Sequence, residues 1–347
     1  GRRAGQAAGP PPMTVVSCVS LVSPVGYSAA ATCAALRAGI AAFEELDYRD
    51  RMAMPIRGAR VDAIAPSRRG RERLRMLARL VLEHIEPDIG AALPWAQMPL
   101  ILCTRDKETP GAQLNGMFSD LRFPDGSAVN GRRTAHIAAG QTSAFAALMQ
   151  ARKMLGEGAP ACLVLAIDSL IDARTLAWLD RHVRLKTSET TDGLIPGEAA
   201  CLAVVSHRPM TPRHVAVRGL GLGAETATAI NEEPFRANGL AGALKTALAE
   251  ARTEMHEVAF RFSDVSGESY AFEELALAQV RNMRKTRPTQ PIWHPADCIG
   301  DTGAAAGLIQ LAWAEQAFGR GYAPGDLAAL HSSSMAFAGR AAAIVSA

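Results

Sequence analysis

Two successive sets of strand-like and helical segments constrain the fold of this chain more than any other feature. The first set has apolar runs at 14–22, 100–104, 161–168 and 201–205, and the second has them at 215–222, 258–265, 327–331 and 341–345. Runs that are apolar at consecutive positions indicate strands buried on both faces of a sheet. Helical patterns lie between them, so the sequence predicts an α/β chain of two similar halves, 13–206 and 213–347, with a linker at 207–212. Within the first half we expect 40–66 to be irregular apart from one possible strand near 60–64, and 105–131 to be a long loop.

Composition bounds the size and class of the protein. The chain has 347 residues, of which 48% are hydrophobic, and this is enough for two core-forming units. Residues 1–12 lack an apolar segment, so we expect a disordered leader rather than a secretory signal. No window approaches the roughly 18 apolar residues of a membrane span. A net charge of +3 does not indicate a nucleic-acid-binding protein.

The cysteines and arginines give two further expectations. The six cysteines show no CxxC or metal-ligand spacing, which predicts reduced, mostly buried thiols in the cytoplasm and no metal site. A helical pattern over 68–86 carries Arg68, Arg69, Arg71, Arg73 and Arg75. We expect a solvated basic face there, and the alternative is a docking surface for an acidic protein.

The stretch 139–148 connects a strand-like run at 133–137 to an Ala-rich helical pattern. The first N–H groups of a helix have no partner within it, so a tight turn at this point can present a reactive side chain to them. A nucleophile there would be Cys or Ser, but the turn carries Gln141, whose amide only donates and accepts hydrogen bonds. Taken alone, the stretch favours an ordinary strand–helix junction.

Four motifs, in order, resemble those of the β-ketoacyl-ACP synthases of the thiolase superfamily. Ser23-Pro24-Val25-Gly26 resembles the family's opening Thr-Pro-x-Gly turn, and Asp192-Gly193-Leu194-x-x-Gly197-Glu198-x-Ala200 resembles its Asp-Gly-Phe-x-x-Gly-Glu-Gly-Ala strand entry. Gly300 with Ala305-Ala306-Gly307 resembles its Gly-His-x-x-Gly-Ala-Ala-Gly helix start, and Ser333-Ser334-Met335-Ala336-Phe337-Ala338-Gly339 resembles its Asn-Ser-Phe-Gly-Phe-Gly-Gly loop. The resemblance covers 14–347.

The resemblance implies a five-layered αβαβα fold of two pseudo-duplicated halves, usually dimeric. It also implies an acyltransferase in which a Cys thiolate accepts the acyl chain and two His residues promote malonyl decarboxylation and stabilise the oxyanion. The acyl group would arrive on the pantetheine of acyl carrier protein or of CoA, and no other cofactor is expected.

None of the three family residues is present at its position. Aligning the helix through 146–148 places Gln141 at the Cys, with Gly140 as the one-residue alternative. Ser266, before Gly267, falls at the first His, and Asp301 falls at the second. The chain therefore resembles a divergent member without the Cys-His-His triad, and an ionised carboxylate at 301 would oppose an oxyanion. Whether the chain is an enzyme stays open.

Three functions remain open. The first is a non-condensing synthase homologue of fatty-acid or polyketide metabolism, which would be an acyl-binding homologue or the chain-length-factor-like partner of an active ketosynthase. Such a chain would form a homodimer or a heterodimer and would meet acyl carrier protein. The second is a malonyl-ACP decarboxylase. The third is an acyltransferase with a relocated nucleophile, for which Cys298 is the candidate, with His294 nearby.

The remaining candidate residues have secondary roles. The side chains expected to line a substrate pocket are His136, Ser143, Gly267, His294, Phe337 and Gly339. Phe337 is either a gate or a core aromatic, and Asp168 either faces the site or caps the next helix. We expect Glu198 to be a hydrogen-bond partner of a loop. The glycines of 219–223 lie along an apolar strand and do not indicate a nucleotide-binding loop.

Overall fold

The computed structural model describes residues 13–111, 121–129 and 134–347, and its strands form a ten-stranded mixed sheet and a separate hairpin. The first half contributes β1 (Thr14–Val22), β4 (Leu100–Thr104), β5 (Thr134–Ala138), β6 (Cys162–Ser169) and β7 (Glu198–Ser206). The second contributes β8 (Val215–Ala224), β9 (Phe260–Ser263), β10 (Ile292–Trp293), β11 (Leu327–Ser333) and β12 (Gly339–Ser346). The expected leader at 1–12 and part of the expected loop at 105–131 lie outside the described residues.

Both halves have the same strand order. From their junction outward, the first half runs β1-β7-β6-β4-β5 and the second runs β8-β12-β11-β9-β10. In each half the three outer strands are parallel, and the two pairings nearest the junction are antiparallel. The halves join where β1 pairs with β8, which it does only over 14–16. This repeated order confirms the predicted α/β fold of two pseudo-duplicated halves.

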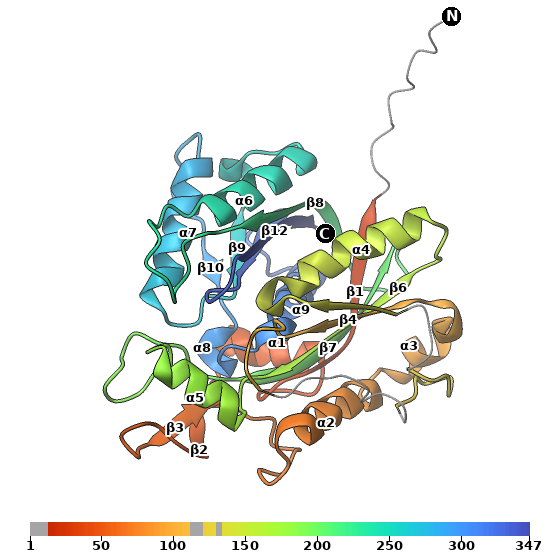
Figure 1. The fold of residues 1–347 in the computed structure, drawn as a ribbon. Coiled ribbons are helices and arrows are strands. Elements are labelled where there is room, and N and C mark those ends of the chain that lie inside the picture. Colours follow the sequence, from red (N-terminus) through yellow and green to blue (C-terminus); the bar gives the residue numbers. More distant parts are fainter. Residues whose placement is uncertain (1–12, 112–120, 130–133) are drawn as a thin grey trace, which may run out of the picture.

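The helices complete five layers. Helices α4 and α9 lie between the two half-sheets, α2 and α3 cover the outer face of the first, and α6 and α7 cover the outer face of the second (Figure 1). The helices are α1 (Ala29–Ala38), α2 (Gly70–Glu83), α3 (Pro87–Ala92), α4 (Ser143–Gly156), α5 (Ala173–Arg181), α6 (Asn238–Ala251), α7 (Ser269–Asn282), α8 (Ala296–Ile299) and α9 (Ala306–Gly319). The order of layers is thus αβαβα. None of the described helices has the length and apolar composition that a bilayer crossing requires.

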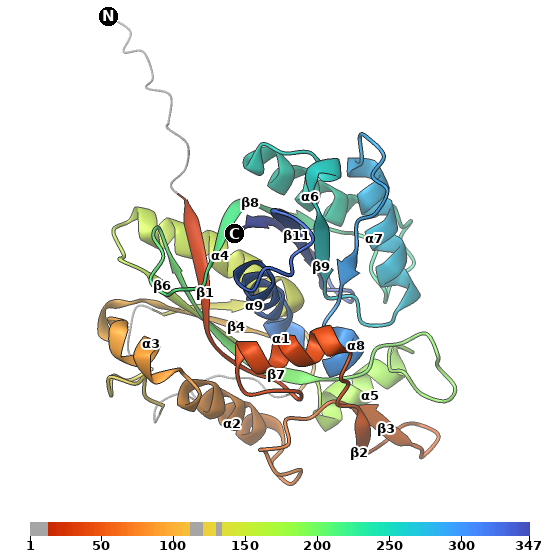
Figure 2. The same ribbon diagram turned by 180° about the vertical axis from the view of Figure 1, so that it is seen from behind.

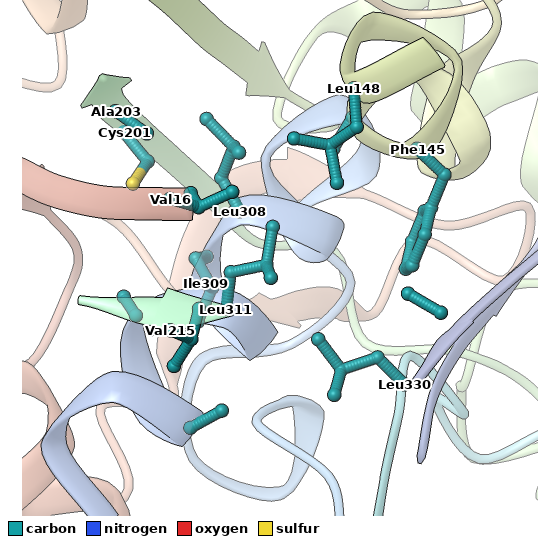
Figure 3. Close-up of a cluster of buried hydrophobic side chains, with 14 of the residues drawn as sticks. Val16, Phe145, Leu148, Cys201, Ala203, Val215, Leu308, Ile309, Leu311 and Leu330 are labelled. Carbon is teal, nitrogen blue, oxygen red and sulfur yellow. The ribbon is translucent and has the colours of Figure 1, made fainter. Parts of the chain in front are cut away.

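The two central helices are in close contact because their sequences are rich in small residues. Twelve of the fourteen residues of α9 are buried, which is typical of a helix enclosed by a core on all sides. A Cβ on Gly307 would lie 2.7 Å from the Cβ of Ala144 and 2.9 Å from a ring carbon of Phe145, so only glycine allows this approach. Figure 3 shows Leu308 and Leu311 of α9 in the same cluster as Phe145.

A row of glycines on β8 allows α6 to pack directly on the strand. A Cβ would lie 2.0 Å from the carbonyl oxygen of Ala247 at Gly219, and 2.0 Å from that of Ala243 at Gly221. These glycines therefore allow close packing of the helix, and they do not form a nucleotide-binding loop, as expected from their position along an apolar strand.

Two sequence-based expectations were wrong. Residues 40–66 were expected to be irregular apart from a strand near 60–64, but they contain the hairpin of β2 (Glu44–Arg49) and β3 (Pro55–Gly58), and 60–64 is not a strand. The basic face of α2 is not wholly solvated, because Arg73 is buried and donates two hydrogen bonds to Glu198. Burial of an arginine requires such a partner, which a helical pattern alone does not reveal.

Candidate functional site

The turn between β5 and α4 has the geometry of a sharp elbow. Gly140 opens the 3₁₀ turn Gly140–Thr142 with φ of 52°, in the left-handed region that favours glycine. A Cβ at this position would lie 3.5 Å from Asp106 N and 3.7 Å from the Ser334 hydroxyl, so the backbone conformation rather than lack of space favours glycine. The left-handed residue of the elbow is thus Gly140, and Gln141 follows it. Neither Gly140 nor Gln141, the two residues that could align with the family's Cys, carries a nucleophilic atom.

The structure brings together Gln141 and Asp301, the two residues that the sequence analysis predicted at the positions of the family's Cys and second His. The Gln141 amide Nε2 donates to Asp301, at 3.0 Å to Oδ2 and 3.3 Å to Oδ1. Asp301 is only 5% exposed, and its Oδ1 also accepts the N–H of Gly303 at 2.8 Å. Burial raises the pKa of Asp301 to about 6, against the Gly303 hydrogen bond and the nearby charge of Arg184, which lower it. The carboxyl group is therefore mostly ionised at neutral pH.

A buried ion pair that the sequence analysis missed lies beside this contact. Arg184 follows α5, and its Nε and Nη2 each donate at 2.7 Å to the two carboxylate oxygens of Glu268, which precedes α7. Both side chains are 7% exposed. Glu268 directly follows Ser266-Gly267, which the motif alignment placed at the site, so its position in the sequence could have indicated that it lies there. Its partner is distant in sequence, and no local pattern identifies it.

A second buried ion pair, between Arg105 and Asp168, also lies at this site. Asp168, at the end of β6, accepts from Arg105 Nη2 at 2.8 Å and from the Ala304 N–H at 3.1 Å. A Cβ on Gly303 would lie 2.2 Å from Asp168 Oδ2. Asp168 therefore faces the site and binds the start of the turn that leads into α9, while α5 is capped by Asp172.

The cavity at Gln141 is small and nearly filled by side chains. Its volume is about 40 Å³, which holds about three water molecules. It is lined by Gly140, Gln141, Asp301, Arg184, Trp178 and Phe337, among others. The rings of Trp178 and Phe337 stack with centroids 6.2 Å apart and planes 13° apart. Phe337 is half-buried and lies in the wall of this cavity, as a gate would.

Five other residues expected at the site do not line this cavity. Ser143 is fully buried, and its hydroxyl donates to the Gly140 carbonyl at 2.6 Å. His136 is exposed on β5 and bonds the Thr104 hydroxyl through Nε2 at 2.8 Å. Ser266 is half-buried, and Gly267 is exposed with φ of 110°. Gly339 also lies outside the cavity lining but abuts the elbow, since a Cβ there would lie 2.9 Å from Thr142 Oγ1.

Cys298 lies in the central core rather than at the elbow. It is 5% exposed, and burial together with the charge of Asp297 raises the pKa of its thiol. His294 Nδ1 pairs with Asp297 Oδ2 at 2.8 Å, which raises the pKa of His294. Neither Cys298 nor His294 lines the cavity at Gln141. A thiol with a raised pKa is a poor nucleophile, so this geometry does not favour a relocated nucleophile.

Glu198 is a structural hydrogen-bond partner, as expected. It is fully buried and accepts the Val61 N–H at 2.8 Å, the Ser169 hydroxyl at 2.7 Å and the Arg73 guanidinium. Through these bonds β7 is fixed to the segment before α2.

Comparison with known proteins gives a fold. No protein-family model and no curated protein sequence matches the chain. Among solved structures, the ishigamide ketosynthase/chain length factor has a TM-score of 0.73 at 17% identity, covering 97% of this chain and 99% of that one. A ketosynthase (ApeO) in complex with its chain length factor (ApeC) from Xenorhabdus doucetiae has a TM-score of 0.75 at 14% identity, covering 98% and 100%.

A third solved structure is a type II polyketide synthase acyl-carrier protein in complex with its ketosynthase bound to the hexaketide. Its TM-score is 0.73 at 13% identity, covering 97% of this chain and 100% of that one. The chain therefore has the thiolase-like fold of ketosynthases and chain length factors, as its motifs implied.

Proposed function

We propose that this chain is a non-condensing homologue of β-ketoacyl-ACP synthases and the chain-length-factor-like partner of an active ketosynthase. The observation that carries the proposal is the contact between Gln141 and Asp301. In the motif alignment this pair is an amide and a carboxylate at positions where condensation needs a thiolate and an imidazole, and an amide cannot form an acyl-enzyme.

The small cavity supports a partner role over an acyl-binding one. A volume of about 40 Å³ cannot hold an acyl chain beside Gln141. A protein that keeps the whole fold but leaves only this small space beside Gln141 contributes an interaction surface rather than chemistry. Two of the similar structures pair a ketosynthase with a chain length factor, which supports a heterodimer of that kind.

The proposal places the pair, and the acyl carrier protein that would serve the active subunit, in the cytoplasm. The six cysteines are unpaired thiols, of which five are buried, and this agrees with a reducing compartment.

Co-expression tests the partner role. The chain is produced alone and together with a ketosynthase from the same genome that keeps Cys-His-His, and both samples are analysed by size-exclusion chromatography with light scattering. We expect a one-to-one complex that survives dilution. A stable homodimer that fails to retain the synthase would overturn the heterodimer.

Intact-mass spectrometry tests the absence of covalent catalysis. The chain is incubated with acyl-ACP and malonyl-ACP, and its mass and the released CO₂ are measured beside an active synthase as positive control. We expect no acyl adduct and no CO₂ above background. An adduct that disappears in Cys298→Ser would instead establish the relocated nucleophile, and CO₂ release without an adduct would establish the decarboxylase.

A further inference from the structure

A second cavity lies where the two half-sheets separate. Beyond its short pairing with β8, β1 remains paired with β7, and the space on its other side is bounded by α1, the segment between α2 and α3, the 210–213 segment and α9. Figure 2 shows β1, α1, α3 and α9 from this side. The cavity volume is about 330 Å³, within the range of small-molecule sites. None of its lining residues lines the cavity at Gln141.

Three residues with buried polar side chains line this cavity, Ser20, Glu315 and Gln316. Glu315, on the mostly apolar helix α9, is 3% exposed, and its Oε2 accepts the Cys18 N–H at 2.7 Å. Gln316 Oε1 accepts from Arg320 Nε at 2.8 Å. The Ser20 hydroxyl oxygen has no partner among the described residues, but it is shielded from solvent and therefore from the cavity. The second oxygen of Glu315, Oε1, accepts no hydrogen bond from a described residue and is not shielded in this way. Glu315 Oε1 is therefore the acceptor that a ligand in this open cavity can reach.

The remaining lining residues indicate the polarity and the charge of a ligand that would fit. Val19, Ala29, Ala30, Ile89, Ala92 and Met210 provide an apolar wall. Three carboxyl groups, of Glu86, Asp88 and Glu315, line the cavity against the single guanidinium of Arg213, which lies 3.8 Å from Glu86. His84 also lines it, and its Nδ1 bonds the Leu80 carbonyl. Acidic groups thus outnumber basic ones around an apolar space.

We propose that this cavity binds a small primary amine with an apolar body, whose ammonium group donates to the Glu315 carboxylate. The hydrocarbon part lies against Ile89 and Met210. The amine gives a donor to the carboxylate oxygen that has no partner, and its charge compensates a carboxyl group that is otherwise buried with one backbone donor. No substrate of the elbow is involved, so this inference is independent of the proposed function.

The ionisation of Glu315 predicts how binding depends on pH. Burial raises the pKa of Glu315 to about 8, with the Cys18 N–H and Arg213 opposing the shift and Glu86 adding to it. Near pH 7 the carboxyl group is therefore mostly protonated, and binding of an ammonium releases a proton. We expect roughly eight-fold tighter binding at pH 8.5 than at pH 7.0, provided that the amine itself stays protonated.

Isothermal titration calorimetry of the full chain with benzylamine, benzyl alcohol and benzoate tests the proposal. The three probes share a ring and differ in charge. We expect benzylamine to bind at least ten-fold tighter than either of the others, with proton release revealed by buffers of different ionisation enthalpy. Equal binding of the alcohol, tighter binding of benzoate, or no binding of benzylamine would overturn it.

Two variants locate the site. Glu315→Gln keeps an acceptor for the Cys18 N–H but removes the charge, and we expect it to weaken benzylamine at least ten-fold. Glu83→Gln makes the same change on an exposed residue outside the cavity and is expected to leave binding unchanged. Unaltered binding by a folded Glu315→Gln variant would contradict the proposal. If that variant fails to fold, the comparison of benzylamine with benzyl alcohol and benzoate on the unmodified chain still tests whether the cavity prefers an amine.

Discussion

At the scale of single residues, the raised pKa of Asp301 makes the free energy of unfolding depend on pH. Its pKa in the folded chain is about 6, above the value of about 3.9 for an unfolded chain. The folded state thus holds the proton more tightly, and this contribution to stability is present at low pH and is lost as the pH rises through 6. Between pH 5 and pH 7.5 the loss is about 1 kcal/mol.

The variant Asp301→Asn tests this contribution. An amide cannot ionise, keeps an acceptor for the Gly303 N–H, and pairs with Gln141 once that side chain turns its oxygen inward. We expect the stability of the variant relative to the unmodified chain to rise by about 1 kcal/mol between pH 5 and pH 7.5. Urea unfolding at the two pH values measures the change. An unchanged difference would show that Asp301 titrates normally.

The buried pair of Arg184 and Glu268 leads to a prediction of a different kind. Glu268→Gln leaves a guanidinium that is 7% exposed without its paired carboxylate and with only the charge of Asp301 nearby, which costs about 3 kcal/mol in unfolding free energy. Replacing both residues by methionine removes the stranded charge and is expected to recover at least half of that loss. Chemical denaturation of the two variants measures both values. A double variant less stable than Glu268→Gln would show that the pair itself is net stabilising.

At the scale of secondary-structure elements, the contact between β8 and α6 depends on glycine. In Gly221→Ala the new Cβ would meet the Ala243 carbonyl oxygen at 2.0 Å, so helix and strand must separate. We expect a loss of about 3 kcal/mol, at the upper end for an overpacked site. Gly242→Ala lies on the exposed side of α6 with no atom within 4 Å and is the matched control. We expect it to be neutral or to stabilise by about 0.5 kcal/mol. Thermal unfolding distinguishes the two.

The same elements show how far sequence reasoning reaches. The buried strands and the elbow could be predicted because consecutive apolar residues and small-residue turns are local signals. The β2–β3 hairpin was missed because Glu44–Arg49 is charged and mostly exposed, so it has no apolar pattern. Arg73 was assigned to the solvated face because its partner, Glu198, lies 125 positions away. The small volume of the cavity at Gln141 depends on side chains from segments far apart in the chain, and no local pattern encodes it.

At the scale of the whole molecule, the two halves share one core. Helix α9 belongs to the second half, but its glycine meets Ala144 and Phe145 of the first, and its Glu315 bonds the backbone of β1. Arg184 and Glu268 connect the halves again at the elbow. Each half on its own would therefore expose side chains of the central layer that are buried against the other half.

We therefore predict that fragments 13–206 and 213–347 do not fold separately. Exposing Leu308, Ile309 and Leu311 of α9 would each cost roughly 1.5–3 kcal/mol, a sum comparable to the 5–15 kcal/mol stability of a typical protein. Each fragment alone should lack a cooperative transition in near-ultraviolet circular dichroism, whereas an equimolar mixture should recover one. The intact chain should show coincident near- and far-ultraviolet transitions in urea. A cooperative transition of either fragment by itself would mean that the central layer is an interface between two autonomous domains rather than a shared core.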